Sequence, residues 1–273
     1  MMKSMNYSTV IGLFISVLLF GFIFIFKAQN PLSFINGAGL AIVIGGTIAA
    51  LFISYPLREI KQAFRTLKTI LFYESLNPQK EANEIIAVSK MWFGRDSIAV
   101  ENEIEKINNP YLRTGIQLVV DKTPVEDILS LLRWRIARLR AKEKTAADIF
   151  RSMSYFAPAF GMIGTLVGLI NMLQIIEAKD IGLITLNMGM ALTTTFYGLI
   201  LANLIFNPIA IKLERRTEQR VMIMSMVMEG IILITDRRTP SFIRETLNSF
   251  LTHHDNDLHE PIILDENADN PLL

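Results

Sequence analysis

The sequence predicts an all-α membrane protein with four transmembrane helices. They form two hairpins, with a cytoplasmic amphipathic helical domain between spans two and three. Apolar residues make up 51% of the 273 positions and are gathered into long uncharged blocks, and about 20 apolar residues suffice for one membrane-spanning helix. Between the blocks, apolar residues recur at helical spacing. No good alternating run of apolar and polar residues indicates a strand.

The first hairpin is predicted over residues 1–55, with spans at about 7–26 and 35–55. The block "YSTVIGLFISVLLFGFIFIF" is uncharged. Its apolar core is too long for a signal peptide, and no small-residue cleavage site follows it. The second block, "INGAGLAIVIGGTIAALFISY", is also uncharged and contains glycines that allow close helix contact. The short link between them contains Asn30-Pro31, which is a turn signal.

Residues 56–154 are rich in charge and are predicted to form a bundle of amphipathic helices. Asn-Pro and Thr-Pro pairs mark the expected breaks, and they lie at Asn77-Pro78, Asn109-Pro110 and Thr123-Pro124. The run "RWRIARLRAKEK", residues 133–144, is predicted to be a basic helix whose solvated face lies just below the membrane, near anionic lipid.

The second hairpin is predicted over residues 155–209, with spans at about 155–176 and 181–209. Residues 210–252 are expected to be cytoplasmic helices, and the acidic segment 253–273 is expected to be disordered. Three histidines lie beside acidic residues in that tail. A solvated tail is favoured over a metal site there, because no fold fixes the ligand geometry.

Basic residues predict the orientation of the spans. Lysine and arginine concentrate in the segment between the hairpins and after Lys212, whereas the two links carry only Lys27 and Lys179. By the positive-inside rule, the large segment and both termini are cytoplasmic.

Several classes of function are disfavoured by composition. The net charge of +1 gives no indication of nucleic-acid binding, and the absence of cysteine excludes a disulfide framework, a zinc–thiolate site and a cysteine nucleophile. No phosphate-binding loop, catalytic triad or carboxylate pair is visible, so neither an enzyme nor a cofactor is expected. No span carries an ionisable residue in its interior. An ion path would therefore need such a group from a partner.

The third span places one threonine among glycines. Thr165 shares a helical face with Gly161, Gly164 and Gly168 through i, i+3, i+4 and i+7 spacing. The fourth span carries three successive threonines followed by a glycine, namely Thr193, Thr194, Thr195 and Gly198. Threonine hydroxyls can coordinate a small cation or hydrogen-bond to a file of water. Spacing alone favours the alternative, in which threonine bonds to its own helix and glycine permits packing.

Two prolines, Pro158 and Pro208, lie near the predicted cytoplasmic ends of the third and fourth spans. Proline at such a position frees a backbone hydrogen-bonding group. Each proline marks either a hinge or a helix start, and spacing does not distinguish the two.

Two stretches, "APAFGMIGTLVGLINML" and "MALTTTFYGLILANLIFNPIA", resemble the last two spans of the MotA/PomA family, the stator A subunits of the flagellar motor. The stretches "NNPYLRTGIQLVVD" and "RRTPSFIRETLNSFL" are similar to further segments of that family. The order of parts matches as well. The likeness covers almost the whole chain after the first few residues.

This resemblance implies a multi-pass protein of the bacterial inner membrane. Copies of the chain, expected to form a pentamer, would surround a dimer of a peptidoglycan-anchored B subunit. The single span of the B subunit would supply the missing aspartate. Flow of Na⁺ or H⁺ past that aspartate would drive rotation and torque on the flagellar rotor, and so power motility.

The resemblance also implies roles for individual residues. Pro158 and Pro208 match the two functional prolines of the family. Thr165 and Thr195 match hydroxyls associated with sodium use. Sodium is therefore preferred as the transported ion, and a proton remains an alternative.

The rotor-contact region departs from the family pattern. Glu101, in "IAVENE", matches the acidic residue of the family, but the usual arginine falls on Phe93. Arg95 lies two positions out of register and could serve after a local shift. Glu103 and Lys106 are the alternatives.

Two other functions are also compatible with the sequence. One is an ion-driven energiser of the TolQ/ExbB type, which typically has three spans and a different order of parts. The other is a non-conducting membrane scaffold, in which the threonine face serves only for packing.

Overall fold

The computed structural model describes residues 34–72, 77–94, 104, 107, 109–176 and 180–257, together with several helical positions between Ile11 and Phe22. Every regular element within this described part is a helix, and no strand occurs in it. The span predicted at about 7–26 lies largely outside the described residues. Three of the described helices are long and apolar enough to cross a membrane, and they are Gly37–Ser54, Val125–Ile175 and Ile181–Thr235.

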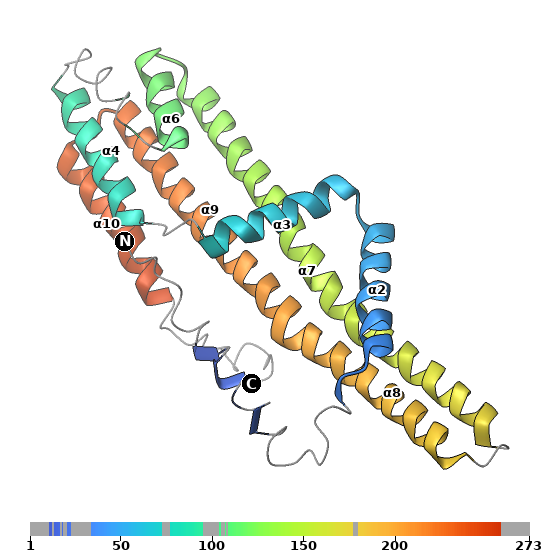
Figure 1. The fold of residues 1–273 in the computed structure, drawn as a ribbon. Helices are drawn as coiled ribbons and strands as arrows, with labels where there is room; N and C mark the ends of the chain where they lie inside the picture. Colours follow the sequence, from blue (N-terminus) through green and yellow to red (C-terminus); the bar gives the residue numbers. More distant parts are fainter. Residues whose placement is uncertain are drawn as a thin grey trace, which may run out of the picture. The chain divides into compact units, whose positions relative to one another are not determined.

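The chain divides into two compact units, here called the span unit and the second unit. The span unit comprises residues 1–75 and 139–219, and the second unit comprises 76–138 and 220–273. Two helices, α7 (Val125–Ile176) and α9 (Asn207–Thr235), contribute residues to both units (Figure 1). The boundary predicted between the cytoplasmic domain and the second hairpin, at residues 154 and 155, falls within the continuous helix α7.

In the span unit, α2 (Gly37–Ser54) is held at both ends by tyrosine hydroxyls. At its start, Tyr197 donates a hydrogen bond to the Phe34 carbonyl and accepts one from the Asn36 N–H at 2.8 Å. Beyond its end, the Tyr55 hydroxyl lies 2.8 Å from the Ser152 hydroxyl of α7. These bonds fix α2 against α7 and against α8 (Ile181–Ile200), the helix that carries Tyr197.

Helix α3 (Leu57–Phe72) follows α2 after the two residues Tyr55 and Pro56, and its axis turns away from that of α2 (Figure 1). Its apolar residues share a buried cluster with α7 and α9, and the cluster includes Ile60, Ala63, Ala147, Ile149, Phe150 and Leu213. The Phe64 and Phe150 rings meet edge to face at 5.4 Å. Near this cluster, the Arg151 guanidinium lies 2.6 Å from the Glu214 carboxylate.

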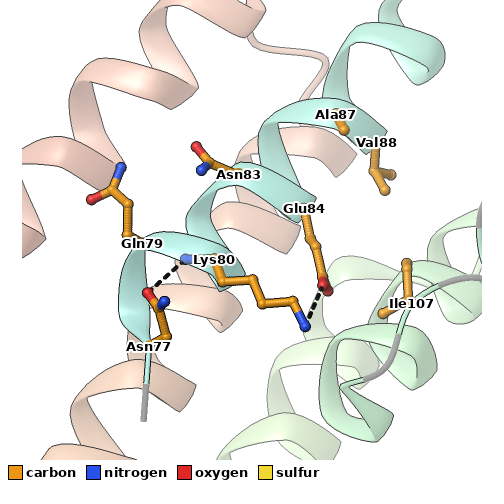
Figure 2. A pocket seen from close by; sticks show the side chains of 8 residues that line it. All are labelled: Asn77, Gln79, Lys80, Asn83, Glu84, Ala87, Val88 and Ile107. Carbon is orange, nitrogen blue, oxygen red and sulfur yellow. Dashed lines mark hydrogen bonds and ion pairs between the residues drawn. The ribbon is translucent and has the colours of Figure 1, made fainter. Parts of the chain in front are cut away.

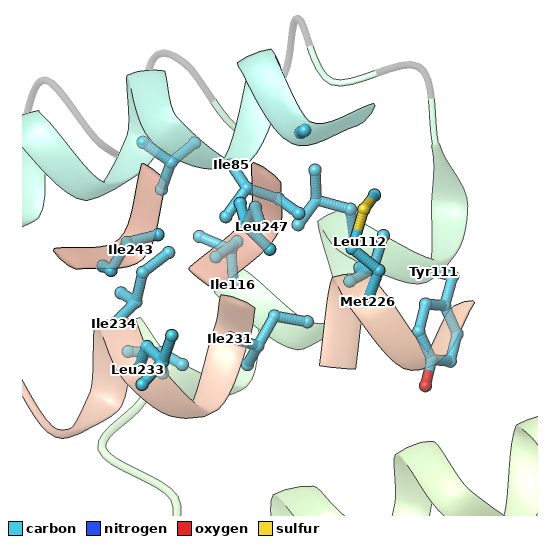
Figure 3. Close-up of a cluster of buried hydrophobic side chains, with 14 of the residues drawn as sticks. Ile85, Tyr111, Leu112, Ile116, Met226, Ile231, Leu233, Ile234, Ile243 and Leu247 are labelled. Atoms are coloured by element: carbon cyan, nitrogen blue, oxygen red, sulfur yellow. The ribbon is translucent and has the colours of Figure 1, made fainter. Parts of the chain in front are cut away.

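The second unit is built around one apolar core. It contains α4 (Pro78–Phe93), α6 (Pro110–Val120), α10 (Pro240–Asp257) and the ends of α7 and α9 that lie in this unit. Figure 3 shows large buried side chains of these helices packed together, among them Ile85, Leu112, Ile116, Met226, Ile231 and Leu247. Gly115 lies directly against the Ile231 side chain, so α6 and α9 approach closely.

The predicted helix breaks are confirmed. Asn77 caps α4 by accepting a hydrogen bond from the Lys80 N–H, and Asn109 caps α6 in the same way. In both helices, proline follows the cap, where its missing N–H leaves no hydrogen bond unmade. The segment after Thr123-Pro124 begins α7 at Val125.

Helix α10 continues to Asp257. This end lies beyond residue 252, where the cytoplasmic helices were predicted to end. Phe250 and Leu251 pack against the core and hold this end of the helix. Residues 258–273, with His259, lie outside the described residues.

We predict that Asn109→Ala lowers the free energy of unfolding by about 2 kcal/mol. The Asn109 side-chain oxygen accepts from the Tyr111 N–H at 2.8 Å, and the side-chain NH₂ donates to Glu81 at 2.7 Å, so the change removes a cap and an inter-helix bond. Asn77→Ala is the control, because it removes only an exposed cap bond of 3.2 Å. Thermal unfolding of the detergent-solubilised chain, followed by circular dichroism, measures both. Equal losses would contradict the role of the Glu81 bond.

Candidate functional site

The candidate site is an oxygen triangle between α7 and α8. The hydroxyl oxygens of Thr165 and Thr195 lie 2.9 Å apart. Both also lie within hydrogen-bonding distance of the Gly161 carbonyl oxygen, at 3.0 Å for Thr165 and 3.3 Å for Thr195. We call these three atoms the oxygen triangle. The helical face predicted for Thr165 therefore meets the threonines of α8.

The triangle has more oxygen pairs than hydrogens to bridge them. Each hydroxyl carries one hydrogen, so only two of the three O···O contacts are hydrogen bonds at any time. Three patterns satisfy this limit. Thr165 donates to Gly161 while Thr195 donates to Thr165, or the roles of the two threonines are reversed, or both hydroxyls donate to the Gly161 carbonyl. In every pattern the oxygens keep lone pairs that can bind water or a cation. The two threonine side chains are partly exposed, which leaves the triangle open to a partner.

Thr194 lies apart from the triangle, although sequence reasoning placed it in the same ion path. Its side chain is fully buried, and its hydroxyl donates to the Ala191 carbonyl at 2.7 Å. Its methyl group lies against Gly39 of α2, and its side chain also contacts Gly164 of α7. Thr194 thus packs where three helices meet, and its buried hydroxyl is bonded within its own helix.

The glycines predicted for packing lie at the contact between α7 and α8. A Cβ added to Gly164 would lie 2.7 Å from the Thr194 side chain, and one added to Gly168 would lie 2.8 Å from the Ala191 Cβ. At Gly161 the nearest atom is the Thr194 carbonyl oxygen at 3.0 Å. At Gly198 it is the Ala157 carbonyl oxygen at 2.6 Å. Distances under about 3 Å leave no room for a side chain.

The two prolines occupy different surroundings. Pro158 is half-buried inside α7, and its Cα would lie 3.0 Å from a Cβ added to Gly198. Pro208 is exposed at the start of α9. It comes two positions after the end of the π-helix η2 (Leu201–Phe206), and the Asn207 N–H bonds to the Ala202 carbonyl five residues earlier. Pro208 has no backbone N–H to donate to the carbonyl four residues earlier. This proline was the only indication in the sequence of the π-helix η2.

A polar cavity of about 450 Å³ lies along α4 in the second unit (Figure 2). The Glu84 carboxylate lies 3.9 Å from the Lys80 ammonium on its wall. Burial raises the pKa of Glu84, the Glu81 carboxylate raises it further, and Lys80 opposes both. Asn77, Gln79 and Asn83 complete the polar lining. None of the predicted ion-path residues lines this cavity.

The predicted rotor-contact residues Glu101 and Arg95 lie outside the described residues, as do Glu103 and Lys106. Phe93, on which the family arginine falls, is exposed at the last position of α4. Within the described part of the chain, no three His, Asp or Glu side chains are grouped closely enough to hold a metal ion.

Comparison with known proteins gives a consistent result. A family described as the MotA/TolQ/ExbB proton channel family matches residues 103–226. Motility protein A of Borreliella burgdorferi is 30% identical, over 92% of this chain and 96% of that protein. Chemotaxis protein PomA of Vibrio alginolyticus is 30% identical, over 90% of this chain and 96% of that protein. An uncharacterised Bacillus subtilis protein, YtxD, is 33% identical, over 91% and 92% of the respective chains.

Solved structures share the fold. The structure of C. jejuni MotAB matches with a TM-score of 0.84 and 22% identity, covering 91% of this chain and 97% of that one. The flagellar MotAB stator complex from Bacillus subtilis matches with a TM-score of 0.80 and 23% identity, covering 94% and 100%.

We predict that Gly198→Ala destabilises the purified chain by about 2 kcal/mol, because the new methyl group would be forced against backbone atoms of α7. The control is Gly189→Ala on the same helix, where nothing lies within 4 Å of the added Cβ. The midpoints of thermal unfolding in detergent compare the two. If Gly198→Ala unfolds at the same temperature as Gly189→Ala, α7 and α8 are not packed as closely as described.

Proposed function

The chain belongs to the MotA/PomA family of flagellar motor stator A subunits, and we propose that it couples cation flow to torque in a bacterial flagellar motor. The observation that carries this proposal is the likeness to Motility protein A and to PomA at 30% identity over at least nine-tenths of the chain. An enzymatic role has no support from the described side chains.

The proposed topology has four spans in two hairpins, with residues 56–154 and both termini in the cytoplasm. Three candidate spans among the described helices support it, together with the uncharged block at 7–26 and the concentration of basic residues between the hairpins. This topology makes the chain a multi-pass protein of the inner membrane.

The proposed partner is a B subunit of the MotB/PomB kind, anchored to peptidoglycan. The spans of this chain contain no ionisable residue, so an ion crossing beside them needs a titrating group from elsewhere. The two solved structures compared above are of MotAB, which supports a complex of two kinds of subunit. We extend the proposal to a pentamer of this chain around a B dimer.

The oxygen triangle is the proposed contribution of this chain to the ion path. A bare or partly hydrated Na⁺ would find uncharged oxygen ligands in the Thr165 and Thr195 hydroxyls and the Gly161 carbonyl. A proton would instead pass through the hydroxyls and water by reversal of the hydrogen bonds. Sodium is the preferred ion, since hydroxyl ligands have no required role in proton transfer from water to a carboxylate. Thr194 would act only by setting the spacing of the helices.

The coupling of ion flow to motion is proposed to use Pro158 and Pro208. Each removes one backbone hydrogen bond near the expected cytoplasmic end of a span, and so permits bending there. The rotor contact is proposed to involve Glu101, with Arg95 as its basic counterpart. Exposed charge pairs contribute only about 0–1 kcal/mol each, which suits a contact that must form and break repeatedly.

The energiser of the TolQ/ExbB type remains a second candidate because the matched family includes it by name. The motor is favoured since several relatives that match along nearly all of their length are named Motility protein A or chemotaxis protein PomA. Reporter fusions separate the two. A periplasmic N-terminus with a single span before the large domain would favour the energiser.

We predict that Thr165→Val combined with Thr195→Val lowers cation flux through the complex with the B subunit about tenfold. The loss of two oxygen ligands corresponds to about 1.4 kcal/mol, the scale of one or two hydrogen bonds. Thr185→Val is the matched control, because Thr185 is exposed and bonds only to the Ile181 carbonyl of its own helix. Flux is measured in membrane vesicles with a sodium gradient and, separately, with a proton gradient. Unchanged flux in the double variant would support a packing role alone.

We also predict that flux and swimming require both subunits. The chain expressed alone should leave vesicles as impermeable to cations as empty membranes, because it supplies no titrating group within its spans. Co-expression with the cognate B subunit should produce the flux, and a B subunit with Asp→Asn in its span should not. Substantial flux through the chain alone, or normal swimming after its deletion, would contradict the proposed function.

A further inference from the structure

Helix α3 carries a continuous row of basic side chains, which we call the basic row. Its members are Arg58, Lys61, Arg65 and Lys68, and all four are exposed. Their spacing of three, four and three residues places them within about 80° of arc around the helix, at about 100° per residue. Glu59, the acidic residue in the first turn of the helix, lies on the other side.

The basic row has no internal partner in the described part of the chain. None of the four side chains forms an ion pair there with a described carboxylate. Elsewhere in the same unit, Arg151 does pair with Glu214. Four like charges along one exposed face repel one another, and neighbouring anions would relieve this repulsion.

Packing fixes the direction in which the basic row faces. Ile60 and Ala63 are buried in the cluster that α3 shares with α7 and α9, and the Phe64 ring meets the Phe150 ring. The helix therefore cannot rotate to hide its charges. Leu57 and Phe64 remain 53% and 46% exposed on the flank next to the basic row. One side of α3 thus combines exposed apolar groups with lysine and arginine.

The chain holds this side of α3 close to the membrane. Only Tyr55 and Pro56 separate the first residue of α3 from Ser54, the last residue of the candidate span α2. The three steps from Ser54 to Leu57 reach at most about 11 Å. Helix α3 therefore begins at the surface of the bilayer that α2 crosses, and it turns away from the axis of α2 (Figure 1).

We propose that α3 lies along the membrane surface and that its basic row binds the headgroups of anionic phospholipids. Leu57 and Phe64 would enter the boundary between headgroups and acyl chains, while the longer basic side chains extend to the phosphates. Each lysine or arginine near an anionic surface is attracted to it. The direct chain connection to a span favours lipid over an acidic protein, because lipid is already adjacent. This inference goes beyond the motor role and requires only that α2 spans the bilayer.

The test measures lipid preference with the full chain reconstituted in phosphatidylcholine vesicles. Spin-labelled phosphatidylglycerol and spin-labelled phosphatidylcholine are compared by the fraction that the protein immobilises. We expect the wild-type chain to prefer phosphatidylglycerol about threefold at low salt, and to lose most of this preference at about 1 M salt. The variant K61Q/R65Q/K68Q should show almost no preference.

Two control variants separate the basic row from general charge and from folding. K90Q/K122Q/R244Q removes the same charge from exposed positions of the second unit and should keep the wild-type preference. K61R/K68R keeps the charge of the basic row, and this variant should also keep the wild-type preference for phosphatidylglycerol. The proposal is overturned if K61Q/R65Q/K68Q keeps its preference for phosphatidylglycerol. It is also overturned if K90Q/K122Q/R244Q loses as much of that preference as K61Q/R65Q/K68Q does. If the row variant keeps its lipid preference but no longer co-purifies with the B subunit, the row binds protein instead. Neither flux nor swimming enters this measurement.

Discussion

The close approach of α7 and α8 is the constraint on which the rest of the span unit depends. Four glycines, at 161, 164, 168 and 198, remove the side chains that would hold the two backbones apart. In a bilayer no hydrophobic force drives helices together, so close packing and hydrogen bonds between them must do so. The same approach brings the Thr165 and Thr195 hydroxyls to one carbonyl oxygen. The glycines therefore create the site as well as the hairpin.

Other contacts hold further helices onto this pair. Tyr197 and Tyr55 bind the two ends of α2, and Thr194 fills the junction of three helices. The apolar side of α3 packs against α7 and α9. The tyrosine contacts use polar groups whose partners lie within the protein, whereas α3 packs through large apolar side chains such as Ile60 and Phe64. The apolar surfaces of residues 37–54, 155–176 and 181–209 are left for lipid or for neighbouring subunits, and these segments contain no Asp, Glu, Lys, Arg or His.

Features set by neighbouring residues were predictable from the sequence. The Asn-Pro pairs predicted the starts of α4 and α6, because an N-cap and a proline at the first helical position act within one turn. Helical periodicity also predicted that Thr165 and the glycines share a face. Features that join distant residues were not predictable. Tyr197 binds Phe34 across 163 positions, and no local pattern marks such a pair. The π-helix before Pro208 and the burial of Thr194 likewise depend on the packed neighbours.

The hydroxyl hydrogens of the oxygen triangle can be rearranged without any change in how the helices pack. Rotation of the two O–H bonds changes the direction of the local dipole while every heavy atom stays in place. The oxygens can therefore present different lone pairs to a neighbouring positive charge. A rigidly packed helix pair thus keeps a local polarisability of its own. Tight glycine packing leaves these polar groups free to reorient.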